Sequence, residues 1–212
     1  MVKMNKIINV FTENIYPKWE LDEAEVIKVT RKIVEFYLGA GDEIQSANDE
    51  KLNNKNNQST DDIASLLEIS CLGSVDFDTV TFDILFCDGE KTHQINRDYR
   101  DKDYVADIIT FAIFADDDSK FVLDGDVNLG EIIIALDKIE QEAEKTGVDK
   151  YYQLYFLIAH GILHLLGFDH QTEEDYNFVV SVQKKALKYA GIFEHPISIK
   201  TEENNPEGDN ND

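Results

Sequence analysis

Residues 149–166 constrain the fold most strongly, because a helix through this segment is apolar on nearly every side. Such a helix has to be buried among other elements of its domain. It carries His160 and His164, which are four residues apart and therefore lie on one helix face. Gly167 can end the helix, after which a turn brings His170 back toward the same point. The sequence thus predicts a buried helix and a following turn that gather three histidines.

This histidine cluster is typical of a metal site, since it holds three of the five histidines in the chain. Three neutral imidazoles with one open position are characteristic of a catalytic zinc centre, although imidazole also binds copper, nickel and iron. Without a metal, each buried histidine would need its own hydrogen-bond partner. A structural zinc would need a fourth protein ligand, and neither Cys71 nor Cys87 belongs to this segment. We therefore expect one zinc ion per chain, held by His160, His164 and His170.

The spacing of the three histidines also occurs in a large group of zinc proteases. In those enzymes a glutamate follows the first histidine and takes a proton from the zinc-bound water. Gly161 occupies that position here, so the ligands of a protease are present without its general base. Gly161 either leaves room beside the metal or lets the helix pack closely against a sheet. Asp169 either orients a ligand histidine or is the polar residue of a tight turn.

Length and composition predict a single domain with two acidic additions. We expect residues 1–191 to form the domain, with a flexible insertion at 40–62 and an acidic, disordered tail at 192–212. The net charge of −23 argues against a broad nucleic-acid-binding face, so any such binding needs a local basic pocket. Two cysteines, no apolar run of membrane-spanning length and no secretory pattern at the N-terminus predict a cytoplasmic protein without membrane association.

The periodicity of apolar residues predicts both strands and helices. Strands are expected at residues 6–11, 64–72, 79–87, 105–114 and 131–134. Helices are expected at residues 21–38, 88–99, 136–145, 149–166 and 172–189. Thr172 is expected to cap the last helix and Gly191 to stop it. This mixture predicts an α+β fold in which one sheet packs against a layer of helices.

A second motif lies upstream, where residues 96–103 follow the pattern N-x-x-Y-R-x-x-D and lead into a strand at 107–111. Alone, it is an ordinary charged helix end before a strand. Residues 160–170 also fit H-G-x-L-H-L-x-G-[YF]-D-H, and residues 129–134 fit L-G-[DE]-I-x-I. With these three segments the chain resembles the YbeY family, bacterial rRNA-maturation endoribonucleases. The resemblance runs from about residue 6 to residue 191, interrupted by residues 40–60.

The resemblance implies a zinc-dependent, single-strand-specific endoribonuclease in 16S rRNA 3′-end maturation and ribosome quality control. It implies an rRNA precursor as substrate and the ribosome or its small subunit as partner, with no role for DNA. The implied fold is a mixed four-stranded sheet packed against several helices, with a metal cleft formed by the buried helix and the following turn. The three histidines match the family's zinc ligands. Arg100 matches its active-site arginine, whose role is to hold the scissile phosphate and stabilise charge in the transition state.

One departure from the family and two other functions stay open at this point. Val105 and Ala106 stand where the family usually has Pro-Thr, so a threonine hydroxyl is missing near the expected cleft. A zinc hydrolase of another substrate, such as a peptide, would need a base from elsewhere, for example Glu131 or Asp107. A non-catalytic ribosome-assembly factor would use the metal for structure alone.

Overall fold

The computed structural model describes residues 6–40 and 66–194, and in these residues four strands form one mixed sheet. The strands are β1 (Ile7–Asn14), β2 (Thr79–Cys87), β3 (Ile108–Phe111) and β4 (Asp126–Ala135). Their order across the sheet is β1-β2-β4-β3. β2 pairs in parallel with β1 and β4, whereas β3 runs antiparallel to β4. The α+β fold with a mixed four-stranded sheet is therefore confirmed.

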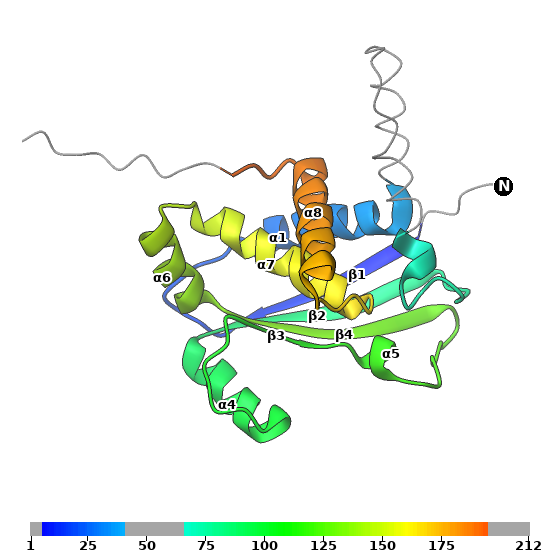
Figure 1. The fold of residues 1–212 in the computed structure, drawn as a ribbon, viewed down its shortest axis with the longest axis horizontal. Helices are drawn as coiled ribbons and strands as arrows, with labels where there is room; N and C mark the ends of the chain where they lie inside the picture. The colour runs from blue at the N-terminus through cyan, green and yellow to red at the C-terminus, as the bar shows by residue number, and fades with distance from the viewer. Residues whose placement is uncertain (1–5, 41–65, 195–212) are drawn as a thin grey trace, which may run out of the picture.

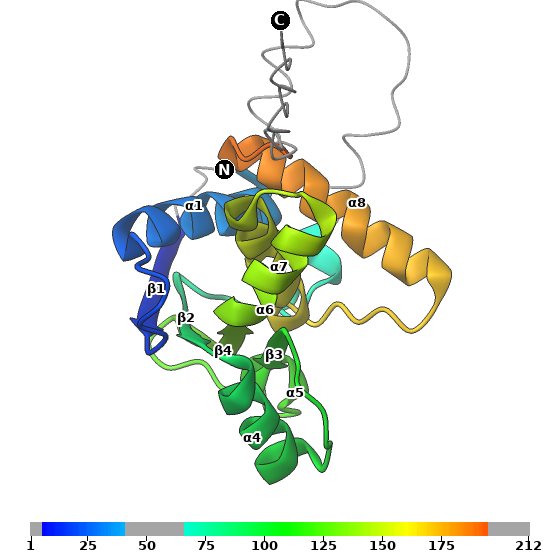
Figure 2. The same ribbon diagram turned by 90° about the vertical axis from the view of Figure 1, so that its left-hand side faces the viewer.

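Helices cover both faces of the sheet, but unequally. They include α1 (Glu23–Glu35), α4 (Gly89–Arg100), α5 (Ile113–Asp116), α6 (Leu136–Thr146), α7 (Lys150–Leu165) and α8 (Glu173–Ala190). A short π-helix, η1 (Phe36–Ala40), follows α1 directly. Figure 1 shows α1, α7 and α8 together on one side of the strands. Figure 2 shows the sheet edge-on, with α4 on the opposite side. The fold therefore has a thick helical layer on one face and a single helix on part of the other.

The central strand β4 is buried on both faces, which explains its continuous apolar run. Ile132 and Ile134 belong to the large apolar cluster beneath α1, α7 and α8. Ile133 belongs to a second, smaller cluster beneath α4, together with Ile95 and Ile109. Successive side chains of a strand point to opposite faces, so an uninterrupted apolar segment is what a doubly covered strand requires.

The helix α7 begins and ends where the sequence predicts. The Asp149 carboxylate accepts hydrogen bonds from the first backbone amides of the helix. At the other end Gly167 has φ +89°, a conformation that glycine adopts without strain. The Gly167 amide donates to the His164 carbonyl and the Phe168 amide donates to the Leu163 carbonyl. This closure reverses the chain direction and starts the turn that carries His170.

The last helix also matches its predicted ends. The Thr172 hydroxyl and the Asp175 carboxylate form a reciprocal capping box at the start of α8. Gly191 ends the helix with φ +85°. The position of α8 against α7 therefore follows from strong local signals at both of its ends.

The strand predicted at residues 64–72 is wrong. Residues 66–69 are helical and residues 71–74 form a turn, while 64 and 65 lie outside the described residues. Leu66 and Leu72 are both buried in the large cluster, and the Cys71 amide donates to the Leu166 carbonyl. A short apolar run shows no periodicity that distinguishes a strand from a helical turn. The apolar residues of this segment therefore predicted burial correctly but not the type of element.

Two other strands have different bounds from those predicted. The strand expected at residues 105–114 is limited to β3, because α5 follows almost at once. The strand expected at 131–134 begins earlier, at Asp126, and pairs with β2 across a register shift. Near that shift Gly130 has φ +124°, and a Cβ added there would lie 2.0 Å from the Phe111 carbonyl oxygen. The first part of β4 was not predicted because polar residues and a glycine interrupt its apolar pattern. Its hydrogen bonding to β2 is what shows that it belongs to the strand.

Parts of the predicted domain organisation fall outside the described residues. These are nearly all of the insertion expected at 40–62 and residues 195–212 of the expected tail. Within residues 6–40 and 66–194, no helix combines the length and apolar character that a membrane span needs.

Candidate metal centre

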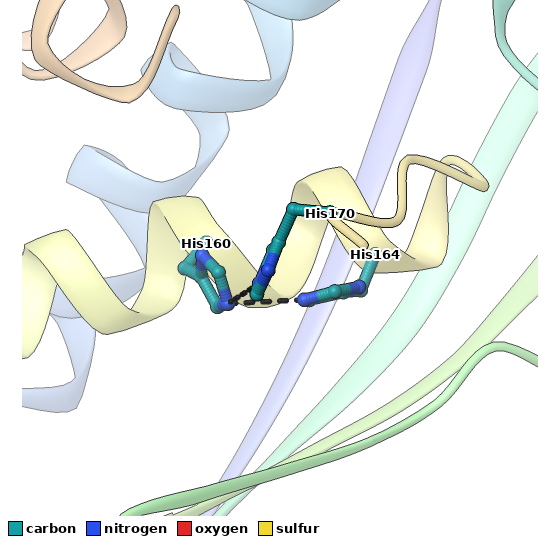
Figure 3. Close-up of side chains that lie close together, drawn as sticks. All are labelled: His160, His164 and His170. Atoms are coloured by element: carbon teal, nitrogen blue, oxygen red, sulfur yellow. Dashed lines mark hydrogen bonds between the residues drawn. The ribbon is translucent and has the colours of Figure 1, made fainter. Parts of the chain in front are cut away.

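The structure brings the three predicted ligands together at one point (Figure 3). The Nε2 atom of His160 lies 3.0 Å from Nε2 of His164 and 3.4 Å from Nε2 of His170. Zinc–nitrogen bonds of about 2.0–2.1 Å place the nitrogens of a tetrahedral site about 3.3 Å apart. These separations fit one shared ion, and the donor set suits zinc. The three histidines could therefore hold a metal ion, as the sequence predicts.

Burial keeps two of these imidazoles uncharged. It is the main cause that lowers the pKa of His160, and it lowers the pKa of His164 to about 4. The neighbouring His160 and His170 further lower the pKa of His164. At neutral pH both rings are neutral, which is the form that donates a lone pair to a metal. His160 and His164 are thus ready to bind a cation without first losing protons.

Gln183 is a site residue that sequence reasoning missed. Its side chain is fully buried on α8, and its amide nitrogen donates to the Phe156 carbonyl at 3.1 Å. Its amide oxygen therefore faces Nδ1 of His160, 3.4 Å away. An oxygen there accepts from Nδ1–H, which leaves the Nε2 lone pair directed at the other histidines. Only the packing of α8 on α7 reveals this role, because Gln183 lies 23 residues from His160.

An open cavity of about 470 Å³ adjoins the histidines. Besides the histidines, its lining includes Arg100, Thr110 and Asp116. Arg100 is the exposed last residue of α4, and its charge contributes to the low pKa of His164. Within residues 6–40 and 66–194, no carboxylate forms an ion pair with it. An anion in this cavity would therefore meet a free guanidinium on one wall and the histidine cluster on another.

Asp169 lines the same cavity and makes the contacts of a tight turn. Its carboxylate accepts from the His170 backbone amide at 2.8 Å and from the Gln171 side chain at 2.9 Å. The Gln171 hydrogen bond is the first cause, and the His170 amide the second, that lowers the Asp169 pKa. These contacts stabilise the backbone that presents His170. Asp169 thus has the contacts of the polar residue of a tight turn, next to the predicted ligand His170.

The cavity does not lose a hydroxyl through the alanine at position 106, where the family usually has threonine. Ala106 is buried in the smaller apolar cluster beneath α4, and its carbonyl accepts from the Thr92 hydroxyl at 2.7 Å. A side chain at position 106 therefore points away from the cavity, and the sequence-based concern about it is wrong. Thr110, two residues into β3, has its side chain in the cavity lining instead.

Neither alternative base lies in the histidine cavity. Glu131 lines a separate recess with Asp83 and Glu13, on the sheet face opposite α7. Burial, followed by the charges of those two acids, raises its pKa. Asp107 is exposed and lines a neighbouring pocket, although its charge reaches His160 and raises that pKa. Glu131 is therefore separated from the histidines by the sheet itself.

The structure decides between the two roles considered for Gly161. A Cβ there would lie 2.9 Å from both Cδ1 and Cγ2 of Ile132, and 3.1 Å from Cδ1 of Ile108. Gly161 thus faces the sheet and allows close packing of α7, while the adjacent His160 faces the cavity.

We expect Gly161→Ala to lower the free energy of unfolding by about 1 kcal/mol. Overpacking against Ile132 costs about 1–3 kcal/mol, which exceeds the gain of about 1 kcal/mol from the better helix former. Denaturant unfolding in the presence of a chelator measures the change without any metal contribution. Ser181→Ala, at an exposed position of α8, is the control and should change stability by less than about 0.5 kcal/mol. A stabilised Gly161→Ala protein would show that this contact is loose.

Comparison with known proteins places these features in one family. A family model described as Endoribonuclease YbeY matches residues 43–191, which include Arg100 and the three histidines. Endoribonuclease YbeY of a Geobacillus species is 41% identical over 112 residues, covering 51% of this chain and 72% of the relative. The Bacillus licheniformis protein of the same name is 35% identical over 134 residues, covering 62% of this chain and 85% of the relative. The solution structure of TM1509 from Thermotoga maritima is 17% identical with a TM-score of 0.46, covering 87% of this chain and 89% of that one.

Proposed function

The chain belongs to the YbeY family, and we propose that it is a zinc-dependent endoribonuclease that cleaves single-stranded RNA. One observation carries the proposal: three Nε2 atoms converge in an open cavity whose lining also contains Arg100. The name of the relatives supports RNA as the substrate class. A phosphodiester fits a cavity that presents a cation and a guanidinium together.

The residues of the cavity have distinct tasks in this proposal. His160, His164 and His170 would hold the ion, and imidazole ligands leave its charge uncancelled. A zinc ion bound there would supply a Lewis acid, able to polarise a phosphate oxygen and to lower the pKa of a water molecule to about 7. Arg100 donates to the phosphate oxygens and stabilises the charge that develops on them during cleavage. Gln183 holds His160 in the required tautomer.

The overall charge of the chain supports single-stranded RNA as the substrate. A net charge of −23 provides no broad basic face along which a duplex would lie. A short cavity that presents the Arg100 guanidinium, together with a metal ion once one is bound, instead suits a strand that enters one nucleotide at a time. The acidic surface would also repel RNA that does not reach the cavity.

The biological setting of the proposal comes from the family. We propose an rRNA precursor as substrate, in 16S rRNA 3′-end maturation and ribosome quality control, with the ribosome or its small subunit as partner. A cytoplasmic location fits the two free cysteines. We also propose that residues 1–191 act as one domain, because β1 and α1 share one sheet and one apolar cluster with the elements after residue 66.

Metal removal tests the proposed function. Purified protein should contain about one zinc ion per chain by mass spectrometry, and should cleave a single-stranded RNA oligonucleotide. Chelation should abolish cleavage, and added zinc should restore it, because the ion supplies the Lewis acid. Cleavage that survives chelation would contradict metal dependence. Cleavage of casein without cleavage of RNA would support the peptidase alternative, so casein and a duplex of the same RNA sequence are the control substrates.

A further inference from the structure

A second pocket, of about 360 Å³, lies beside the histidine cavity along α7. Tyr152, Phe156, His160 and His164 follow one another at four-residue intervals, and all four side chains are half-buried. They therefore form one stripe along the helix, with about one turn, or 5.4 Å, between successive members. The two histidines line the cavity and the two aromatic residues line the second pocket. We call this second space the α7 pocket.

Two aromatic rings form part of the wall of the α7 pocket. The rings of Tyr152 and Phe156 are stacked, with 6.3 Å between centroids and 29° between planes. Both rings pack on the large apolar cluster and leave part of their surface exposed to the pocket. Ile139 and Val148 extend the apolar lining. A planar, partly apolar ligand would cover this surface, as a nucleobase does when it stacks on aromatic side chains.

Lysines from two different helices complete the pocket. Lys138 of α6 and the exposed Lys184 of α8 both line it. Ammonium groups beside a stacking surface are what the flanking phosphates of a bound nucleotide require. Lys184 also directly follows Gln183, the residue that contacts His160, so its backbone lies close to the histidine site. These lysines provide two ammonium groups beside the stacking surface, each able to bind a phosphate that flanks the bound base.

Acidic groups in the lining of the α7 pocket favour binding of a nucleobase over binding of a free anion. Asp107, Glu142 and Glu194 also line the pocket. Glu142 is paired with Lys145 at 3.2 Å, and the Asp107 carboxylate accepts from the Ile108 backbone amide at 2.8 Å. The remaining carboxylate oxygens can accept hydrogen bonds from the amino and imino groups of a nucleobase. A mixed lining of this kind would bind a free phosphate poorly, because the acids repel it.

We propose that the α7 pocket binds a nucleobase of the single-stranded RNA substrate, next to the nucleotide whose phosphate lies at the histidine site. This inference rests on the proposed function and names a site for the neighbouring nucleotide. The pocket volume is within the usual range of ligand sites, about 300–1,000 Å³. Its place next to the cavity along one helix face sets the direction in which the strand would leave the metal centre.

An abasic scan combined with pocket variants tests the inference. RNA oligonucleotides are prepared with one base removed at each position around the cleavage site, and kcat/KM is measured for each. With the unaltered protein, removing the base at one position adjacent to the cleaved bond should lower kcat/KM at least about fivefold. This loss corresponds to the lower end of the free energy of base–aromatic stacking. With Tyr152→Ala or Phe156→Ala, intact RNA should show the same loss and removal of that base should have no further effect.

Matched variants separate the pocket from general effects of substitution. Phe11→Ala removes an exposed aromatic ring outside the pocket, and should keep the original abasic profile. Lys184→Ala should raise KM, whereas Lys188→Ala, one turn further along α8 and outside the pocket, should not. Zinc content and circular dichroism should be unchanged in every variant.

The outcomes distinguish this inference from the proposed function. If RNA is cleaved but Tyr152→Ala and Phe156→Ala keep the original kcat/KM and abasic profile, the pocket assignment is overturned and the endoribonuclease proposal stands. If the unaltered protein cleaves no single-stranded RNA, both are overturned. Photocrosslinking with 5-iodouridine needs no variant to fold: crosslinks at Tyr152 or Phe156 are expected, and crosslinks confined to other regions would overturn the assignment.

Discussion

His164→Ala is expected to lose the bound zinc and to cleave RNA at least about a thousandfold more slowly, since the Lewis acid contributes several kcal/mol to the transition state. His164 is one of the two predicted ligands that lie on α7. Its side chain is half-buried and lines the cavity, where Nε2 lies 3.0 Å from Nε2 of His160 and the ring contacts the rings of His160 and His170. The variant should therefore remain folded. Mass spectrometry of the metal and cleavage of a single-stranded oligonucleotide are measured on the same preparation.

His93→Ala is the matched control for this experiment. His93 lies on α4, where Nε2 contacts the Asp103 carboxylate at 2.6 Å, and it does not line the histidine cavity. Zinc content and cleavage should both be retained. If His164→Ala keeps a full equivalent of zinc, the ligand assignment is incorrect. If it loses zinc and unfolds, the metal is structural, which is the assembly-factor alternative. Equal residual cleavage in both preparations would indicate a contaminating ribonuclease.

Arg100→Ala is expected to lower kcat about 10²–10³-fold while zinc content stays unchanged, which is the usual loss when one donor to a developing negative charge is removed. Arg100 is exposed and, within the described residues, forms no ion pair, so its removal should not affect folding. The kcat of Arg100→Lys should lie between those of the unaltered protein and Arg100→Ala, because lysine keeps the charge and loses the bidentate geometry. Single-turnover cleavage at saturating RNA measures the effect on the chemical step.

Arg97→Ala separates a specific contact from general attraction of RNA. Arg97 lies three residues before Arg100 on the same helix, is also exposed and does not line the cavity. Its loss should change KM only slightly, and the change should disappear at higher salt. An equal fall in kcat for both variants would show that Arg100 acts through overall charge. Loss of zinc from Arg100→Ala would show that its role is misassigned.

Local sequence signals predicted the elements whose ends carry strong chemical markers. Gly167 and the Thr172 capping box define the end of α7 and the start of α8, and the structure confirms both. The predicted strand at 64–72 failed because Leu66 and Leu72 are buried by contacts far along the chain, with no periodicity of their own. Apolar residues predict that a segment is buried. They predict whether it is a helix or a strand only when the segment is long enough to show the repeat of its apolar positions.

The histidine cluster was determined by sequence alone, because a four-residue helical spacing and a glycine turn act over a few residues and bring three rings together. The tertiary structure decided everything that depends on distant segments. Packing of α7 on β4 decided the role of Gly161, and packing of α8 on α7 placed Gln183 behind His160. The lining that joins Arg100 to the histidines, and the α7 pocket between three helices, arise in the same way. Such contacts follow from the relative placement of whole elements, which no local pattern encodes.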